Sequence, residues 1–254
     1  MKNHILVGTH HKTGSVWMLK VFRNIASRLK VPFINLSAHS KYYRENIGSQ
    51  EGVNALLAEV GLSSEYTIFF DDHSYFGTID DGLAERFRGF RMVRSPVSVI
   101  SSAAKYHCWS KEKWLHTPRK GVNGIPYQEY IKSLPDDNAR YRFEMKMSAM
   151  NVITAMAEFD REPYFLTVKY EDVINDRSLV KFAGIMAHLG LEGREVLEAL
   201  EAVYVNSLFG ELSSEDQSHV QSDSNTKYGS DWDEDTWNLY NQKVRPLAEK
   251  LGYV

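Results

Sequence analysis

The most informative stretch of this sequence is VGTHHKTGSVW, residues 7–17. It begins at the end of the apolar run 5–8, which is typical of a buried strand. It leads into a segment with apolar residues at helical spacing from Met18 to Leu29. A loop at a helix start that carries a lysine and hydroxyl groups suits a phosphate or sulfate, because helix N-terminal amides attract anions. The alternative is a capped helix with a solvated lysine.

Further apolar runs recur along the chain, each short and bounded by polar residues, glycine or proline. They cover residues 32–36, 67–70, 89–93 and 164–168. Helical patterns alternate with several of them, which is typical of a parallel sheet with helices on both faces. The sequence therefore predicts an α/β, P-loop-like three-layer fold, with a central parallel sheet flanked by helices. We expect a single domain over residues 1–254.

The C-terminal part differs in composition from the rest. Residues 211–235 are strongly acidic with almost no aliphatic side chains, which predicts a long surface loop, and we hypothesise that it closes as a lid. Apolar residues at helical spacing then predict a final helix over residues 234–251. Gly252 stands where a helix C-cap is expected.

The overall composition excludes several classes of protein. The chain has 254 residues and a formal net charge of −3, which argues against a protein that coats nucleic acid or an anionic membrane. The single cysteine, Cys108, excludes an internal disulfide and a cysteine-based zinc site. No apolar run reaches the ~18 residues of a membrane span, and the first residues do not form a signal peptide. We expect a cytoplasmic protein, monomeric or homodimeric, without a metal.

A second candidate anion site lies where the run 89–93 is followed by Arg94, Ser95 and Pro96. Ser95 suits a helix N-cap and Pro96 the first helical position, so this segment also passes from strand to helix. Arginine together with the helical hydroxyl of Ser102 can hold a phosphate by charge-assisted hydrogen bonds. A helix cap beside a surface arginine is the alternative.

Together these residues resemble the sulfotransferases that use 3′-phosphoadenosine 5′-phosphosulfate (PAPS) and release 3′-phosphoadenosine 5′-phosphate (PAP). Residues 12–17 are similar to the phosphosulfate loop of that family, and residues 94–102 fit its Arg-x-Pro-x-x-x-x-x-Ser motif for the 3′-phosphate. A later Tyr-Glu-Asp matches residues 170–172, and the Leu-Gly-Leu at 189–191 is similar to another family segment. The matches span nearly the whole chain, in order.

The resemblance implies roles for the matched residues. Lys12 would contact the oxygen on which negative charge develops, because fixed positive charge supplies much of the catalysis in such transfers. Trp17 would stack on adenine, and the alternative is that it anchors the first helix to the core. Tyr170 matches a family tyrosine beside the nucleotide, and the alternative is a core tyrosine. The residues that the resemblance assigns to the nucleotide are Lys12, Thr13, Gly14, Ser15, Val16, Trp17, Arg94, Ser102 and Tyr170.

The resemblance fails at one cofactor segment. The Gly229-Ser230-Asp231-Trp232 stretch resembles a Gly-Asp-Trp that follows an Arg-Lys-Gly loop in the family, but that Arg-Lys-Gly is absent here. Only Lys227 is available upstream as a cation for the nucleotide.

The acceptor in a sulfuryl transfer also needs a group that takes its proton. The family commonly places a histidine just beyond a strand of this kind, and here the run 67–70 leads into Asp71, Asp72 and His73. An imidazole with a pKa of ~6.5 can accept a proton at neutral pH, so we expect His73 to be the general base. A structural or surface role for His73 is the alternative.

The acidic residues beside His73 depart from the family pattern. Asp71 stands where the family often has lysine, and Asp72 follows it. We hypothesise a cationic acceptor, such as an amine or a guanidinium compound, with one of these carboxylates as its counter-ion. The alternative is that Asp71 faces solvent or caps the next segment.

Aromatic residues elsewhere are candidates for the wall of an acceptor pocket, although they equally fit an ordinary core. The candidates are Phe76, Tyr106, His107 and Trp109. The leading interpretation is thus a PAPS-dependent sulfotransferase acting on a hydroxyl or amine of a small organic molecule. One alternative is a P-loop kinase using ATP and Mg²⁺, disfavoured because His11 replaces the glycine before Lys12. The other is a non-catalytic nucleotide-binding module.

Overall fold

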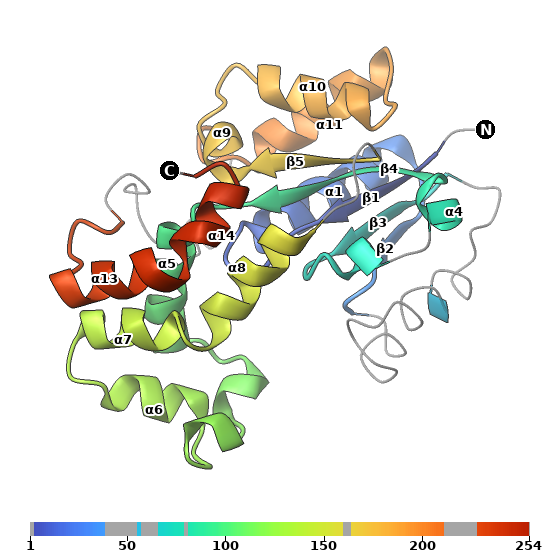
Figure 1. Cartoon of the computed structure of the whole chain (residues 1–254). Helices are drawn as coiled ribbons and strands as arrows, with labels where there is room; N and C mark the ends of the chain where they lie inside the picture. The colour runs from blue at the N-terminus through green and yellow to red at the C-terminus, as the bar shows by residue number, and fades with distance from the viewer. Residues whose placement is uncertain are drawn as a thin grey trace. The chain divides into compact units, whose positions relative to one another are not determined.

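The computed structural model describes residues 3–38, 55–56, 66–78, 81–159, 164–210 and 228–253 (Figure 1). The chain forms two compact units, each assembled from two stretches of sequence. The first comprises Met1–Val93 and Phe159–Gln221, and the second comprises Arg94–Glu158 and Ser222–Val254. The single domain expected over residues 1–254 stays a prediction.

The first unit is built on a five-stranded parallel sheet, and each strand matches one of the apolar runs. The strands are β1 (His4–Gly8), β2 (Phe33–Asn35), β3 (Ile68–Asp71), β4 (Phe87–Val93) and β5 (Phe165–Lys169). Their order in the sheet is β2-β3-β1-β4-β5, and all the pairings are parallel. The predicted parallel α/β fold is therefore confirmed.

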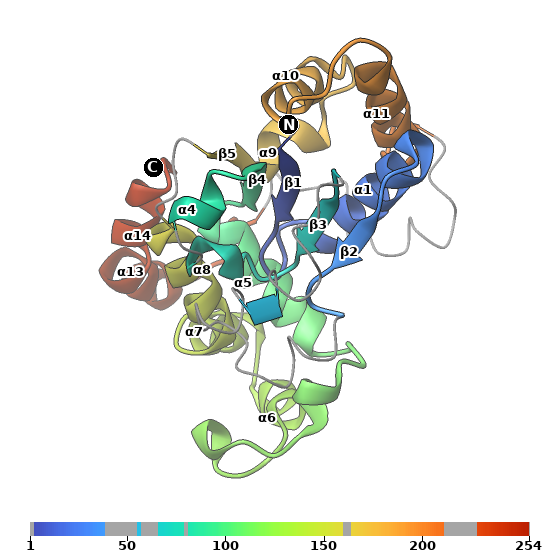
Figure 2. The same ribbon diagram turned by 90° about the vertical axis from the view of Figure 1, so that its right-hand side faces the viewer.

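Side chains that alternate along β1 explain why both faces of the sheet are apolar. Ile5 and Val7 pack into one cluster, whereas Leu6 packs into another, and all three are fully buried. Helices cover the first face, as Figure 2 shows. They are α1 (Ser15–Leu29), α9 (Tyr170–Ile174), α10 (Val180–His188) and α11 (Arg194–Val205). The 3₁₀ turn η1 (Tyr75–Thr78) and α4 (Asp81–Ala84) contribute to the second cluster.

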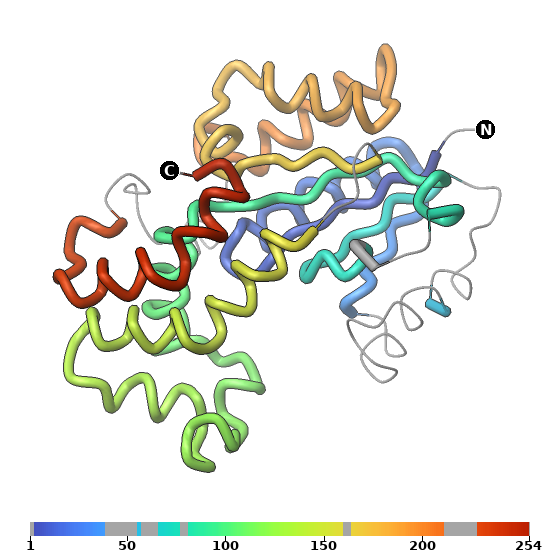
Figure 3. Tube along the Cα trace, viewed as in Figure 1, coloured from blue at the N-terminus to red at the C-terminus, as the bar shows by residue number. Residues whose placement is uncertain are grey.

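In the second unit, the regular secondary structure of the described residues is helical, apart from an isolated antiparallel bridge between Pro118 and Pro126. The unit contains α5 (Pro96–His107), α6 (Tyr127–Ser133), α7 (Asp137–Glu144), α8 (Ser148–Glu158), α13 (Glu234–Lys243) and α14 (Arg245–Lys250), with the 3₁₀ turns η2 (Lys113–His116) and η3 (Lys120–Val122). The tube in Figure 3 traces these helices. Among the described residues of either unit, no helix is long and apolar enough to cross a membrane.

The single C-terminal helix expected over residues 234–251 is wrong, because the segment divides at Val244 into α13 and α14. Pro246 stands in the first turn of α14, where its missing amide donor and fixed φ are tolerated but where it cannot continue a preceding helix. Gly252 ends α14 with a left-handed φ of 71°, and the Tyr253 amide returns to the Ala248 carbonyl at 2.8 Å. The predicted helix stop at Gly252 is confirmed.

Candidate active site

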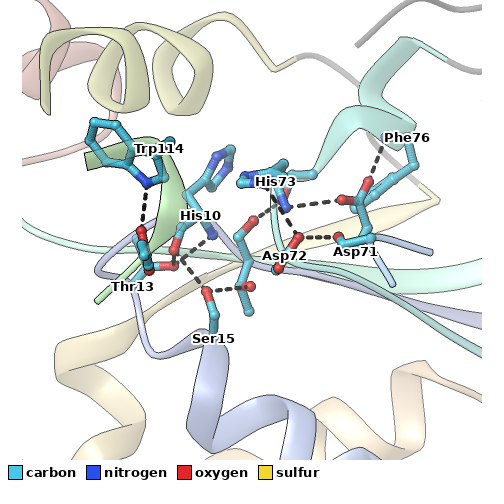
Figure 4. Close-up of polar contacts among 12 residues, drawn as sticks. His10, Thr13, Ser15, Asp71, Asp72, His73, Phe76 and Trp114 are labelled. Carbon is cyan, nitrogen blue, oxygen red and sulfur yellow. Dashed lines mark hydrogen bonds and ion pairs between the residues drawn. The ribbon is translucent and has the colours of Figure 1, made fainter. Parts of the chain in front are cut away.

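The loop that follows β1 is closed by the hydroxyl group of Thr13. Thr13 Oγ1 donates to the carbonyl oxygen of His10 at 2.9 Å and accepts from the amide of His10 at 2.8 Å. The Ser15 hydroxyl donates to the same carbonyl at 3.0 Å and accepts from the Thr9 hydroxyl at 2.8 Å (Figure 4). Two hydroxyls that the sequence assigns to a phosphate are therefore engaged inside the loop, where they fix its shape.

The backbone of this loop takes a left-handed conformation at two positions. Lys12 has a φ of 68° and Gly14 a φ of 99°. This conformation is uncommon for a residue with a side chain, such as Lys12. A Cβ on Gly14 would also approach the Tyr170 ring to 3.1 Å, so two constraints favour glycine there.

Helix α1 begins directly after Gly14. Its first helical hydrogen bond runs from the Met18 amide to the Gly14 carbonyl, at 3.0 Å. The amides of Ser15, Val16 and Trp17 precede this bond, and such amides at a helix start are suited to an anion.

Gly8 lies between two charged residues on the neighbouring strands of the sheet. Gly8 pairs with Asp71 of β3 on one side and with Arg91 of β4 on the other. Arg91 is only 6% exposed, and its Nε donates to Thr167 Oγ1 at 3.1 Å while its Cζ lies 4.4 Å from the centroid of the Phe159 ring. The carboxyl end of the sheet thus carries a buried carboxyl and a buried guanidinium.

Asp71 caps the turn that follows β3. Its Oδ1 accepts from the amide of His73 at 2.9 Å and its Oδ2 from the amide of Phe76 at 3.2 Å. The side chain is fully buried, and this burial raises the pKa of Asp71 to about 6, although the two amides oppose the shift. Of the two alternatives for Asp71, the geometry favours the structural cap over a counter-ion.

Asp72 and His73 face each other at the end of β3, as Figure 4 shows. Asp72 Oδ1 lies 3.6 Å from His73 Nε2, and the same oxygen accepts from the Ser37 hydroxyl. The two side chains are 33% and 37% exposed, so a small molecule can reach both. A carboxylate beside an imidazole can orient the ring by accepting from its N–H group.

The His10 side chain lies near Asp72 and His73, as Figure 4 shows. His10 is 3% exposed, and its Nε2 is buried without a hydrogen-bond partner among the described residues. Burial lowers the pKa of His10 to about 3, and the charges of Arg91 and His73 contribute to the lowering. His10 is therefore neutral at physiological pH.

Trp17 and Tyr170 lie beside the loop on the helical face of the sheet. The Trp17 ring meets Tyr170 and Phe182 edge to face, with centroid distances of 6.2 and 5.7 Å. Tyr170 is 9% exposed and Phe182 is fully buried, so Trp17 anchors the start of α1 to the core. Adenine stacking by Trp17 stays a prediction.

In the second unit, Arg94 and α5 form the other candidate anion site. Ser95 is the N-cap residue as expected, although its side chain makes no capping hydrogen bond, and Arg94 is 7% exposed. The Tyr228 ring has two cations over it, with its centroid 5.6 Å from Arg94 Cζ and 5.8 Å from Lys105 Nζ. Ser102, which is 5% exposed, shares a face of α5 with Lys105 at a spacing of three residues.

The residues expected to form an acceptor wall do not share one environment. Phe76 and His107 are fully buried, Tyr106 donates its hydroxyl to Glu112 at 2.7 Å, and Trp109 is 50% exposed. Packing gives Phe76 and His107 a core role, and their contact with an acceptor stays a prediction. Lys227 and the segment 211–227 lie outside the described residues.

The sequence analysis missed Arg91, Lys105, Tyr228 and Glu144. The position of Arg91 inside the apolar strand FRGFRMV could have marked it as a candidate, because a charged side chain is rarely buried without a partner.

Glu144 is fully buried in the second unit, where it lies 2.6 Å from His107 Nδ1 and accepts from the Tyr127 hydroxyl at 2.9 Å. Burial and this carboxylate raise the pKa of Tyr127.

The fold of this chain is that of known sulfotransferases. No protein-family model and no curated protein sequence matches it. The crystal structure of mouse sulfotransferase SULT7A1 complexed with PAP is similar over 100% of this chain and 86% of that one, with a TM-score of 0.57 and 13% identity.

Two retinol dehydratase structures are also similar. The complex with androsterone and the inactive cofactor PAP matches 97% of this chain and 80% of that one, with a TM-score of 0.53 and 13% identity. The complex with retinol and PAP matches 98% and 82%, again with a TM-score of 0.53 and 13% identity. These likenesses establish the fold that the sequence resemblance predicts.

Asp71 gives a prediction for the pH dependence of stability. Its pKa is about 6 in the folded chain against 3.8 for the free group, so the folded chain takes up the proton at higher pH than the unfolded chain does. By proton linkage, its contribution to the free energy of unfolding rises as the pH falls from about 7 to about 4, by up to about 3 kcal/mol. Asp71→Asn cannot titrate and lacks this increment.

Urea unfolding of both proteins across that pH range measures the difference. We expect the stability of the wild type relative to Asp71→Asn to grow towards low pH, whereas exposed Asp172→Asn should follow the wild-type profile. A difference between wild type and Asp71→Asn that stays constant with pH would contradict the assignment of a buried, protonatable carboxyl.

Proposed function

We propose that this protein transfers a sulfuryl group from PAPS to a hydroxyl or amine of a small organic acceptor. The observation that carries the proposal is the loop after β1, in which Thr13 holds Lys12 and the start of α1 in place, within the fold of PAP-bound sulfotransferases. The ordered motif resemblance along the sequence supports it independently.

The loop fits a phosphosulfate for a physical reason. Gly14 lets the chain pass close to the Tyr170 ring, and its φ of 99° leads the chain into the helix. The amides of Ser15 to Trp17 supply donors without charge, and the ammonium group of Lys12 supplies charge. In this proposal these groups hold the 5′ end of PAPS.

Bound PAPS supplies an activated sulfuryl group, whose sulfur bonds to the acceptor atom while its bond to the phosphate oxygen breaks and leaves the electron pair on PAP. Lys12 stabilises the charge that gathers on that oxygen. His73 takes the proton of the acceptor, and Asp72, 3.6 Å from His73 Nε2, stabilises the imidazolium that results. In this proposal the rate acceleration comes mainly from positioning the two substrates and from the fixed positive charge of Lys12.

The acceptor in this proposal carries a positive charge close to the reacting group. Asp72 is the carboxylate suited to receive it, because its side chain is one-third exposed beside His73. Asp71 is excluded from this part of the proposal, because it is fully buried and both of its oxygens accept from backbone amides.

The first test is nucleotide binding, measured by calorimetry with PAP, ATP·Mg²⁺ and AMP. We expect PAP to bind most tightly, and Lys12→Ala to weaken PAP by about tenfold or more, because a charge-assisted contact is lost. Lys181→Ala removes an exposed lysine of α10 and should leave the affinity unchanged.

A transfer assay completes this test. His73→Ala should lower kcat by about 10²- to 10⁴-fold at unchanged PAP affinity, because only the proton acceptor is removed. Tighter binding of ATP·Mg²⁺ than of PAP would favour a kinase, and PAP binding without transfer to any acceptor would favour a non-catalytic module.

The acceptor class is tested with tyramine and 4-ethylphenol, which share a phenol and differ in the ammonium group. Asp72→Asn should lower kcat/KM for tyramine about three- to tenfold more than for 4-ethylphenol. The expected difference is modest because the Asp72 carboxylate is partly exposed, and water weakens its attraction for the ammonium group. Asp172→Asn is the control and should leave the ratio unchanged. Equal losses on the two phenols would rule out Asp72 as a counter-ion.

A further inference from the structure

His10 carries a buried ring nitrogen for which the described residues offer no partner. Its Nε2 is inaccessible to solvent and makes no hydrogen bond to any residue that the structure describes, and the residue as a whole is only 3% exposed. Leaving such a group unpaired is unfavourable, and buried polar atoms without partners are uncommon in folded proteins. An orphaned nitrogen next to an anion-binding loop points to a ligand atom as its partner.

The backbone of His10 is fixed by hydrogen bonds within the loop. The His10 amide donates to Thr13 Oγ1 at 2.8 Å, and the His10 carbonyl accepts from Thr13 and Ser15. Both peptide groups beside its Cα are therefore fixed, which restricts the directions open to the side chain. In Figure 4 the ring stands on the side of the loop where His73 also lies.

The charges around His10 favour an anionic occupant. Arg91 and His73 are near enough for their charges to lower the pKa of His10, and burial lowers it further, to about 3. The ring is thus a neutral hydrogen-bonding group close to the buried guanidinium of Arg91. A neutral imidazole can donate from one nitrogen without competing with His73 for the proton of an acceptor.

We propose that His10 Nε2–H donates a hydrogen bond to a sulfuryl oxygen of bound PAPS. This inference rests on the proposed function and names a substrate contact that neither the motif resemblance nor the general-base assignment supplies. No bond forms or breaks at His10, and its proton stays on Nε2.

The sulfuryl group is the part of the donor that fits this position. Lys12 and the α1 amides, which follow His10 in the loop, face the phosphate in the proposed function, and His73 faces the acceptor. The group that passes from one to the other is the sulfuryl group, and the His10 side chain lies near that of His73 in Figure 4. Its contact is therefore made with PAPS and absent with PAP.

This difference between PAPS and PAP provides the test. Calorimetry without acceptor measures both affinities for the wild type, His10→Ala and His10→Gln. We expect His10→Ala to weaken PAPS by about tenfold and PAP by less than about twofold, because PAP lacks the sulfuryl group. His10→Gln should restore most of the PAPS affinity, because its amide donor reaches the position of Nε2.

The outcomes separate the inference from the proposed function. Equal weakening of PAPS and PAP by His10→Ala would show a structural role in the loop, and unchanged affinities for both would show no contact; either overturns the inference alone. A wild type that binds neither nucleotide would overturn the proposed function as well. The predicted pattern, a selective loss of PAPS affinity in His10→Ala that His10→Gln largely restores, would establish the contact.

Discussion

The site in the first unit depends on one hydroxyl group. Thr13 Oγ1 donates to the carbonyl of His10 and accepts from its amide, and this pair of bonds closes the turn between β1 and α1. Because the turn is closed, Lys12 is held in a left-handed conformation and α1 begins at Ser15. The same two bonds fix the backbone from which the His10 ring projects. The loop proposed to bind the anion and the neutral imidazole of His10 are thus fixed by the same hydrogen bonds.

The sheet places charges around this loop by register. Gly8 pairs with Asp71 and with Arg91, and neither charge is left in an apolar environment without compensation. Asp71 accepts from two backbone amides, and Arg91 donates to Thr167 and packs on Phe159. With Asp71 committed to capping, the exposed carboxylate beside His73 is Asp72. The sequence motif Asp71-Asp72-His73 therefore divides into a structural residue and a pair open to a ligand.

Periodicity was sufficient for the strands, because each of the five is a short apolar run between polar residues, and β1 to β5 lie where the pattern predicts them. It was insufficient at Val244, where the apolar spacing continues through a helix break that Pro246 imposes. It was also insufficient for Arg91 and His10. Their roles depend on which residues the register and the loop bonds bring together, and a local pattern does not contain that information.

The most direct test of this account is an amide ¹H–¹⁵N NMR titration with PAP and with 3′-AMP, which lacks the 5′-phosphate. If the loop after β1 holds the 5′ end of the nucleotide, PAP will shift the amides of Gly14, Ser15, Val16 and Trp17 strongly and saturably, and 3′-AMP will leave them nearly unmoved. PAP binding that leaves these four amides unshifted would contradict the central claim, because the anion would then be held elsewhere.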